Sequence, residues 1–538
     1  MNHSLLLGLA ANPALPPRLT DRLLALLAAG PAAGAGEEDF DEDFDEDFTD
    51  ELADELADRA DLSRAQTVAL AAYAEHTALH LAYEGKPAAA DIDPEAQPYV
   101  AVALLDSGTA PPAWARLLAA HPDPLVREKL ASCPVLPAEA APLLAADPEV
   151  AVVEELALWA PAEVAAALAR HPHAEVRRAA SCNESVPPEA LAALITGDGL
   201  PAATSCLVCD QEEVPFRHDP HCLLPDCRLR PDAARDGSHG STVLETLQGT
   251  ARNPSTPAEA AASLIGHPSV PVRRGLAERT DLPEALYERL AVDPAPQVRD
   301  AVAANPAIGE SLVRALAADP EREVRRRVAR HPRLPLDLLA QPAVVGAAGP
   351  GPLPRISAAT TAELAELAAS PHGAVRMRVA ERHDLPPELR DALAADPDAS
   401  VVKAVAPHPG LSEERLRATV ARHGVQVLAR VAANPDAPGT LLAELARHEP
   451  PVRRALYEIA VHPRATAGAL LPCLADSRAG QYAAAHPALA PPVLADLLAG
   501  PSRALAQAAA SNPSLPTALM EELVTRCAER RPPTAAAP

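Results

Sequence analysis

From Asn253 the chain reads NPSTPAEAAASLIGHPSVPVRRGLAE, RTDLPEALYERLAVDPAPQVRDAVAA and NPAIGESLVRALAADPEREVRRRVAR, three copies of one 26-residue unit that ends at Arg330. Each copy opens on a turn, and His331-Pro332 opens the next one. A second turn lies inside each copy, at His267-Pro268, Asp293-Pro294 and Asp319-Pro320. A fixed period of about 20 to 50 residues is the signature of a solenoid or a propeller.

The apolar spacing within one copy predicts two helices separated by proline turns. Pro283 suits the first position of a helix, and Leu290 lies on the face that this helix would bury. Asp293-Pro294 ends that helix, because a residue before proline is pushed out of the α region. Val298 and Val302, four residues apart, mark a second, short helix. No segment alternates with a period of two, so we expect stacked helical repeats without strands.

The repeat units resemble a known family. Val302-Ala-Ala-Asn-Pro-Ala-Ile, followed by Leu312, Leu316, Asp319-Pro320 and Val324-Arg325, is similar to the leucine-rich repeat variant family of bacterial proteins. The resemblance implies a right-handed superhelix of alternating α- and 3₁₀-helices in two layers. Because this repeat is slightly longer than the family's usual one, we expect the second element to be a longer helix. The predicted fold is therefore an all-α solenoid of two-helix repeats of about 26 residues, interrupted by a cysteine-rich insertion.

Composition supports a solenoid and limits the partners. Most of the 60 prolines fall at repeat turns, and aromatic residues make up only 2% of the chain, so Ala, Leu and Val must build the core. The net charge is −26, of which residues 37–58 contribute −14 because they hold 14 acids and no Lys or Arg. The rest of the chain is mildly acidic, which disfavours nucleic acid and anionic membranes as partners.

The repeat turns divide the chain into six segments. We expect an N-terminal repeat (1–30), an acidic low-complexity loop (31–60), helical repeats (61–198), a cysteine-rich insertion (199–242), further helical repeats (243–530) and a disordered tail (531–538). No apolar run reaches the length of a membrane span, and no signal peptide is recognised at the N-terminus. We therefore expect a cytoplasmic protein whose cysteines do not form structural disulfides.

The acidic segment has two interpretations. Its acids are punctuated by Phe40, Phe44 and Phe48, three of the four phenylalanines in the chain. A solvated, mobile loop is the simpler interpretation, because so acidic a segment buries little apolar surface. The alternative is a short docking motif, whose phenylalanines lie four apart and could enter a basic groove as one face of a helix.

The cysteine-rich insertion has the ligand spacing of a metal site. Cys206 and Cys209 form one pair, and Cys222 and Cys227 form a second pair, with twelve residues between the two pairs. Two such pairs complete a tetrahedral Cys₄ site for zinc. His218 and His221 lie between the pairs and are the alternates if one cysteine is not a ligand. So short a segment cannot form a hydrophobic core, and a bound metal would stabilise it.

Catalysis at this metal is not expected. Four cysteines fill the coordination shell and leave no open position for a substrate. The chain also lacks a glycine-rich phosphate loop, a GxSxG elbow and an HExxH motif, so we predict a protein that is not an enzyme.

Two further sets of residues recur with the repeat. Histidines precede proline at His121, His171, His267, His331, His408, His462 and His486, where we expect them to hydrogen-bond the turns. Arg273, Arg299, Arg325 and Arg376 follow valine in successive repeats, and we expect them to pair with acids of the repeat or to line a binding face.

The leading functional hypothesis is a non-enzymatic scaffold. It would bind an unidentified protein along the solenoid surface and carry a structural zinc site in its insertion. The alternative is an iron–sulfur protein with a redox or sensing role, its 4Fe–4S cluster presented on a solenoid. The family resemblance implies this alternative, because one member carries such a cluster in a cysteine-rich segment, which is N-terminal there and internal here.

Overall fold

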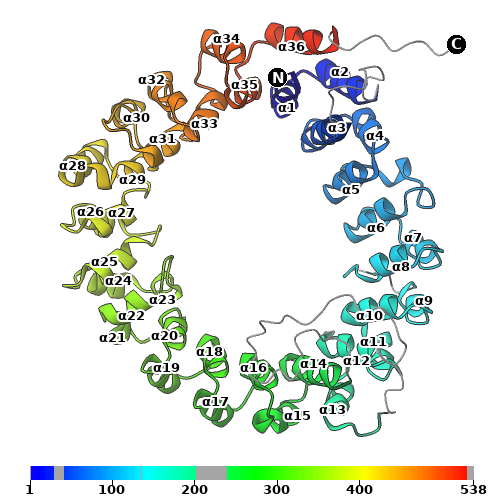
Figure 1. Ribbon diagram of the computed structural model, residues 1–538. Helices are drawn as coiled ribbons and strands as arrows, with labels where there is room; N and C mark the ends of the chain where they lie inside the picture. Colours follow the sequence, from blue (N-terminus) through cyan, green and yellow to red (C-terminus); the bar gives the residue numbers. More distant parts are fainter. Residues whose placement is uncertain (1, 29–41, 135, 138, 201–238, 530–538) are drawn as a thin grey trace, which may run out of the picture. The chain divides into compact units, whose positions relative to one another are not determined.

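The computed structural model describes residues 2–28, 42–134, 136–137, 139–200 and 239–529. Within those residues the chain forms α-helices and short 3₁₀ turns and no strand, which confirms the all-α prediction (Figure 1). The helices group into two compact units. One unit comprises Ile92–Val375, and the other joins Met1–Asp91 to Arg376–Pro538.

The helices of the unit 92–375 follow the two-helix repeat. They are α6 (Pro98–Asp106), α7 (Ala113–Leu118), α8 (Pro124–Ala131), α9 (Ala141–Leu144), α10 (Val150–Trp159), α11 (Ala162–Leu168), α12 (Ala174–Cys182), α13 (Pro188–Thr196), α14 (His239–Arg252), α15 (Ala258–Ala262), α16 (Val270–Glu278), α17 (Glu284–Ala291), α18 (Pro296–Ala304), α19 (Glu310–Ala317), α20 (Arg322–Ala329), α21 (Leu336–Leu339), α22 (Pro342–Ala347), α23 (Pro354–Ser357) and α24 (Thr361–Ala368).

The other unit begins within α25 (Gly373–Ala380). Its further helices are α26 (Pro387–Ala394), α27 (Ala399–Val405), α28 (Glu413–His423), α29 (Leu428–Ala432), α30 (Gly439–Ala446), α31 (Arg453–Ala460), α32 (Ala467–Leu470), α33 (Ala479–Ala485), α34 (Pro491–Ala499), α35 (Arg503–Ala510) and α36 (Thr517–Glu529), together with α1 (Asn2–Ala10), α2 (Pro17–Ala28), α3 (Glu42–Ala57), α4 (Arg64–Ala71) and α5 (Glu75–Tyr83).

Each repeat contributes one helix to each of two layers. In the repeat that starts at Arg279, α17 is the first helix and α18 is the second. The second helices stack directly on one another, so α16 contacts α18 and α18 contacts α20. Val298 and Val302 of α18 are fully buried between neighbouring repeats, and Leu290 of α17 is 1% exposed. The core is thus a row of small apolar contacts repeated along the stack.

The second helix is α-helical over about two turns, which agrees with the expectation that it is longer than the 3₁₀ element of the family. α16, α18 and α20 are α-helices of eight or nine residues. The 3₁₀ turns instead follow first helices, as at Ser263–Gly266 and Leu471–Ala475, or precede α29 at Gly424–Gln426; another lies at Ala89–Asp91. A buried pair of valines four residues apart requires a full α-turn, which explains the longer helix.

The prediction of an acidic loop over residues 31–60 is wrong in its second half. Residues 42–57 form α3, the second helix of its repeat. Leu52, Ala53, Leu56 and Ala57 lie on one face of α3 and are at most 1% exposed. That i, i+1, i+4, i+5 spacing buries enough apolar surface to order a helix despite its acids. Residues 29–41, with Phe40, lie outside the described residues.

Phe48, one of the three phenylalanines of the docking alternative, packs within its own unit, whereas the side chains of Phe40 and Phe44 lie outside the described part of the chain. The Phe48 ring stacks on the imidazole of His3 in α1, with ring centroids 3.9 Å apart. The acidic helix therefore packs inside its own unit.

The chain ends complete one repeat between them. Among the described residues, α36 is the last first helix and α1 is a second helix that precedes every other helix. α1 packs against both α35 and α36, in the position that the second helix of the α36 repeat would take (Figure 1). The unit that contains both termini is therefore one continuous stack whose order passes from residue 529 to residue 2.

Candidate functional site

A ladder of hydrogen bonds joins the residues that open successive repeat turns. In Asn305 the side-chain oxygen accepts from the Ala307 amide of its own turn, at 2.9 Å. Its amide nitrogen donates to the carbonyls of Ala277 and Arg279 in the preceding repeat. One side chain therefore shapes its own turn and satisfies two buried carbonyls of the neighbouring repeat. We call this the turn ladder.

Histidine performs the same two tasks. The Nδ1 atom of His331 accepts from the Arg333 amide at 3.1 Å, and Nε2 donates to the Asn305 carbonyl at 3.0 Å. This geometry requires a neutral ring with its proton on Nε2, because a protonated Nδ1 cannot accept. His462 and His486 repeat the arrangement. The prediction that these histidines hydrogen-bond the turns is confirmed for all three.

His408 departs from the pattern. Its ring is 1% exposed, and neither ring nitrogen has a hydrogen-bond partner. The amide that Nδ1 would accept from, that of Gly410, donates instead to Asp436 at 2.6 Å. Burial lowers the pKa of His408 to about 4, so this rung of the ladder is neutral and unsatisfied.

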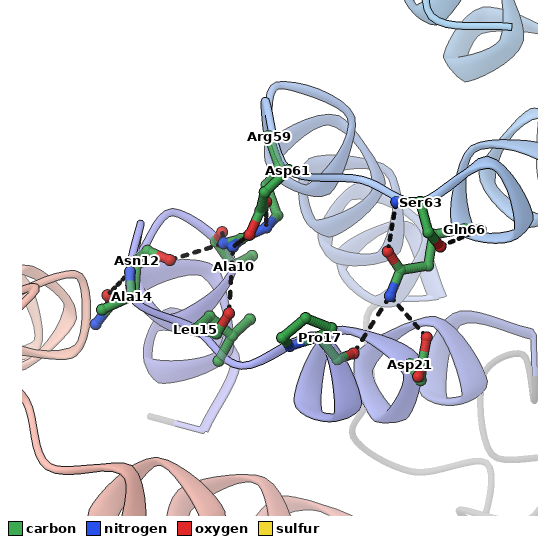
Figure 2. Close-up of polar contacts among 10 residues, drawn as sticks. All are labelled: Ala10, Asn12, Ala14, Leu15, Pro17, Asp21, Arg59, Asp61, Ser63 and Gln66. Atoms are coloured by element: carbon green, nitrogen blue, oxygen red, sulfur yellow. Dashed lines mark hydrogen bonds and ion pairs between the residues drawn. The ribbon is translucent and has the colours of Figure 1, made fainter.

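Where the turn sequence is Arg-x-Asp-Leu, arginine occupies the position in the turn ladder that asparagine or histidine has elsewhere. Figure 2 shows Arg59 donating to the carbonyls of Ala10, Asn12 and Leu15 in the preceding repeat while it pairs with Asp61 at 2.8 Å. Arg279 does the same with the carbonyls of Asn253 and Thr256 and with Asp281. Arg279 opens the second of the three copies with which the sequence analysis begins, whereas Arg59 lies outside those copies. The shared Arg-x-Asp-Leu, at 59–62, 279–282 and 382–385, is the signal that would have found it.

Gln66, in the repeat that Arg59 opens, makes polar contacts with the repeat before it. Its side chain donates to the Pro17 carbonyl and to Asp21, and accepts from the Ser63 amide at the start of α4 (Figure 2). The Ser63 hydroxyl accepts from the Gln66 amide in turn, so the two form a capping box. The start of α4 is thereby fixed to α2.

A second ladder connects arginine to aspartate twenty residues later. Arg299 pairs with Asp319 through two hydrogen bonds, of 2.8 and 3.1 Å, and also donates to the Asp293 carbonyl at 2.8 Å. Arg273 with Asp293 and Arg376 with Asp396 repeat this geometry. We call this the Arg–Asp ladder. Three of the four arginines that recur with the repeat therefore have a structural role. Arg127 forms the same pair with Asp147, which was not predicted from the sequence.

Three carboxylates of this ladder, those of Asp147, Asp319 and Asp396, have a lowered pKa and are held in the ionised form. Burial alone would raise the pKa of Asp319, but hydrogen bonds from Arg299 and from the Glu321 amide, together with the guanidinium charge, hold it below its ordinary value. The same balance lowers the pKa of Asp147 and Asp396. These three pairs of the ladder are therefore charged and nearly buried.

Arg325 is the step at which the Arg–Asp ladder breaks. Its guanidinium donates to the carbonyls of Asp319 and Pro320, as its counterparts do, but it has no carboxylate partner. Twenty residues later stands Val345, and no acid occurs between Asp337 and Glu363. The repeat that follows α20 is shortened, and its turn between α21 and α22, at Ala340-Gln341, holds no aspartate.

Further arginines surround this break. Arg322 and Arg326 on α20 and Arg330 at its C-terminal end follow one another at four-residue intervals, and we call them the arginine stripe. Arg322 has no hydrogen bond or ion pair among the described residues, and Arg326 reaches only Glu323, at 3.4 Å, with its side chain 53% exposed. Arg330 donates to two backbone carbonyls of the next loop, those of Ala348 and Pro350.

Other second helices in this unit neutralise their exposed arginines. Arg274 of α16 pairs with Glu278 at 3.2 Å, and Arg178 of α12 pairs with Glu154 and Glu175. Residues 322–358, in contrast, hold seven arginines and two acids, although the whole chain carries a net charge of −26. The arginine stripe is thus a local positive surface on an acidic protein.

A cleft of about 550 Å³ lies near the stripe in sequence and is lined by residues of α19, α21, α23 and α24. Its arginines are mostly neutralised: Arg314 pairs with Glu310 and Asp337, each at 2.8 Å, and Arg355 pairs with Glu363. The guanidinium of Arg333 is the exception. Because the positive and negative charges of the cleft nearly cancel, the arginine stripe is the more positive of the two surfaces.

The predicted metal ligands cannot be located. Cys206, Cys209, Cys222 and Cys227, with His218 and His221, all lie outside the described residues. α13 ends at Thr196, and α14 begins at His239, four residues before the predicted end of the insertion. The insertion thus falls between the first and second helix of a repeat, as does the segment 29–41 between α2 and α3.

A buried polar cluster lies where the chain returns from the insertion. The Thr242 hydroxyl donates to Glu175, which is 1% exposed and accepts from Arg178 at 2.9 Å. Arg178 also pairs with Glu154, and burial raises the pKa of Glu154 even though that arginine opposes it. The cluster fixes α14 onto α12 and α10. Among the described residues, no group of three or more His, Cys, Asp and Glu has the arrangement of a metal site.

No family model and no curated protein matches the sequence. A solved structure of a leucine-rich repeat variant with a novel repetitive motif is 24% identical, over 45% of this chain and 84% of that chain, with a TM-score of 0.27. A chain from the structure of the Pds5–Scc1 complex is 14% identical, over 90% of this chain and 64% of that chain, with a TM-score of 0.13. At these TM-scores neither likeness carries an argument, so the repeat fold rests on the helices and ladders described above.

No helix among the described residues is long and apolar enough to cross a membrane.

Proposed function

We propose that this protein is a non-enzymatic repeat scaffold that binds a protein partner, and that the arginine stripe of α20 is part of the binding surface. One observation carries the proposal. The ladder arginines of α16 and α18, Arg273 and Arg299, have carboxylate partners, whereas the stripe and Arg325 lie beside a segment, residues 338–362, that holds no acid. Arginine is enriched at protein interfaces, where it forms strong paired hydrogen bonds with carboxylates.

The solenoid supports this function physically. Its repeats contact only their neighbours, so a surface residue can change without loss of a central core. Both ladders lie within the stack and hold successive second helices at a fixed spacing. Exposed side chains on those helices are therefore presented as a rigid row, which lowers the entropic cost of binding.

The insertion adds a second part to the proposal. We propose that Cys206, Cys209, Cys222 and Cys227 bind one structural zinc ion, with His218 or His221 as a substitute ligand. The spacing of the two cysteine pairs supports this assignment. A 4Fe–4S cluster with a redox or sensing role is the alternative, because four thiolates also suit that cluster.

The binding function is tested by affinity capture from a native extract with the full chain as bait. We expect a discrete set of proteins to be retained by the wild type and lost with Arg322→Glu/Arg326→Glu. The matched control is Arg417→Gln/Arg453→Gln, which removes two exposed arginines of the other unit. If both variants retain the same proteins as the wild type, the stripe is not a binding surface.

A further inference from the structure

We infer that the arginine stripe binds an extended acidic segment of the partner, an inference that rests on the proposed function and specifies the partner's chemistry. Residues four apart on a helix lie on one face, roughly 6 Å from one another. Arg322, Arg326 and Arg330 therefore form a row of three positive charges along one side of α20 and its C-terminal end. In an extended strand, alternate side chains point to the same side and lie about 6.6 Å apart, which is close to the spacing of these arginines.

The row is partly held in place before any partner binds. The Arg330 guanidinium donates to the carbonyls of Ala348 and Pro350, both at 3.1 Å. The guanidinium of Arg326 lies beside Gly349, within about 4 Å of the position that a β-carbon would take there. Gly349 has a φ of 71°, a conformation that favours glycine. The loop after α22 thus supports two of the three side chains and leaves their remaining N–H groups exposed.

The surface next to the row is small and uncharged. α22 stacks on α20, and its residues Pro342 to Ala347 carry no charge. A β-carbon added at Gly346 would meet no atom within 4 Å, so the backbone of a bound segment has room there. An extended segment could lie along this surface with alternate carboxylates directed at the stripe.

Charge favours a short acidic peptide over a nucleic acid. Exposed charges are screened beyond about 8 to 10 Å at physiological salt, so a short segment responds mainly to the stripe. A nucleic acid presents phosphates over a longer span and meets the acids that give the chain its net charge of −26. The arginine stripe is therefore suited to alternating Glu or Asp in a peptide.

The inference is tested with labelled synthetic peptides and the full-length protein. The probe is a 12-residue peptide of alternating Glu and Ala, and its control replaces every Glu by Gln. Fluorescence anisotropy should show binding of the Glu peptide that weakens as salt is raised. Arg322→Gln/Arg326→Gln should reduce its affinity about tenfold, because two exposed guanidinium–carboxylate pairs are lost. Arg417→Gln/Arg453→Gln should change it less than about twofold.

Three results would overturn the inference: equal binding of the Gln peptide, an equal loss in the control variant, or preferential binding of a 12-nucleotide single-stranded RNA. Absence of any Glu-peptide binding would overturn it as well. The proposed function is judged separately by affinity capture. If capture depends on Arg322 and Arg326 while the Glu peptide does not bind, the stripe is a protein-binding surface and its partner is not an acidic segment.

Discussion

The side-chain amide of Asn12 donates to the backbone carbonyl of Asn512 at 2.8 Å, across 500 residues of sequence. It donates equally to the Ala510 carbonyl, and its oxygen accepts from the Ala14 amide. Asn512 makes the same bonds to Ala484 and His486 of the repeat before it. Asn12 is therefore the next rung of the turn ladder after Asn512, and the N-terminal helix is bound as an ordinary member of the stack.

We expect Gly8→Leu to detach this N-terminal repeat. A β-carbon at Gly8 would lie 2.2 Å from the Gln507 carbonyl oxygen and 2.8 Å from the Ala510 β-carbon, so α1 could no longer pack on α35. Hydrogen exchange should then increase in both α1 and α35. Gly266→Leu is the control, because a β-carbon at Gly266 meets no atom within 4 Å. Unchanged exchange in the Gly8 variant would show that the two helices do not depend on each other.

We expect Asn434→Leu to destabilise the protein by roughly 2 to 4 kcal/mol, because it leaves the buried carbonyls of Ala406 and His408 without donors. Asn434→His should cost less, since histidine donates to the preceding repeat at other rungs of the ladder. Denaturant unfolding of the two variants measures the difference. Equal losses would mean that the hydrogen bonds of this rung do not carry its stability.

Acid should weaken the turn ladder before it affects the carboxylates. Burial lowers the pKa of His331 and His486, and that of His408 to about 4. Unfolded histidines, with a pKa of about 6.5, bind protons that the folded ones do not, so stability is complete above that pH and declines as the pH falls toward 4. The variant His331→Asn/His408→Asn/His486→Asn should show a smaller decline. A decline of the same size would assign the effect to other groups.

A single substitution at His408 should stabilise the protein. Both of its buried ring nitrogens are unsatisfied, whereas Asn305, Asn434 and Asn512 each donate to the preceding repeat. We expect His408→Asn to gain about 1 kcal/mol in the free energy of unfolding, measured at pH 7, where the histidine is neutral. A loss of stability would show that the ring's apolar packing against His383, at 4.7 Å between centroids, outweighs its missing hydrogen bonds.

Removing only one residue of an Arg–Asp pair should lower the free energy of unfolding more than removing both. Arg299→Met leaves Asp319, whose side chain is 5% exposed, as an unpaired charge, and we expect a loss of about 3 to 5 kcal/mol. Arg299→Met/Asp319→Asn should recover part of that loss, since no buried charge remains. Unfolding of the single and double variants measures the coupling, and a double variant weaker than the single one would contradict this account.

The metal proposal predicts one equivalent of zinc in the purified protein. A strong chelator should make residues 199–242 sensitive to protease while the flanking repeats remain folded, because structural zinc contributes on the order of 10 kcal/mol to such sites. A brown protein after purification without air would favour the iron–sulfur alternative. Neither metal in stoichiometric amount, with all four thiols freely titratable, would reject both.

Local sequence was sufficient wherever the physical cause lies within one repeat. The 26-residue period, the proline turns and the buried valines of α18 all follow from residues a few positions apart, since helix faces and turns are local. The same reasoning failed for α3, whose high acid content concealed the apolar face formed by Leu52 and Leu56. It also missed Arg59, because an arginine in the place of asparagine is recognised only when its bonds to the preceding repeat are seen.

The sequence by itself determined that this chain is a helical solenoid, where its turns lie and which residues open them. Only the tertiary structure decided which rungs are joined: that Asn12 follows Asn512, and that Arg325 lacks the aspartate that Arg299 has. The reason is that a repeat specifies its own helices locally, but each side chain of the ladders is completed by a carbonyl or carboxylate of another repeat. Those partners depend on which repeats stack, and stacking is a property of the folded chain.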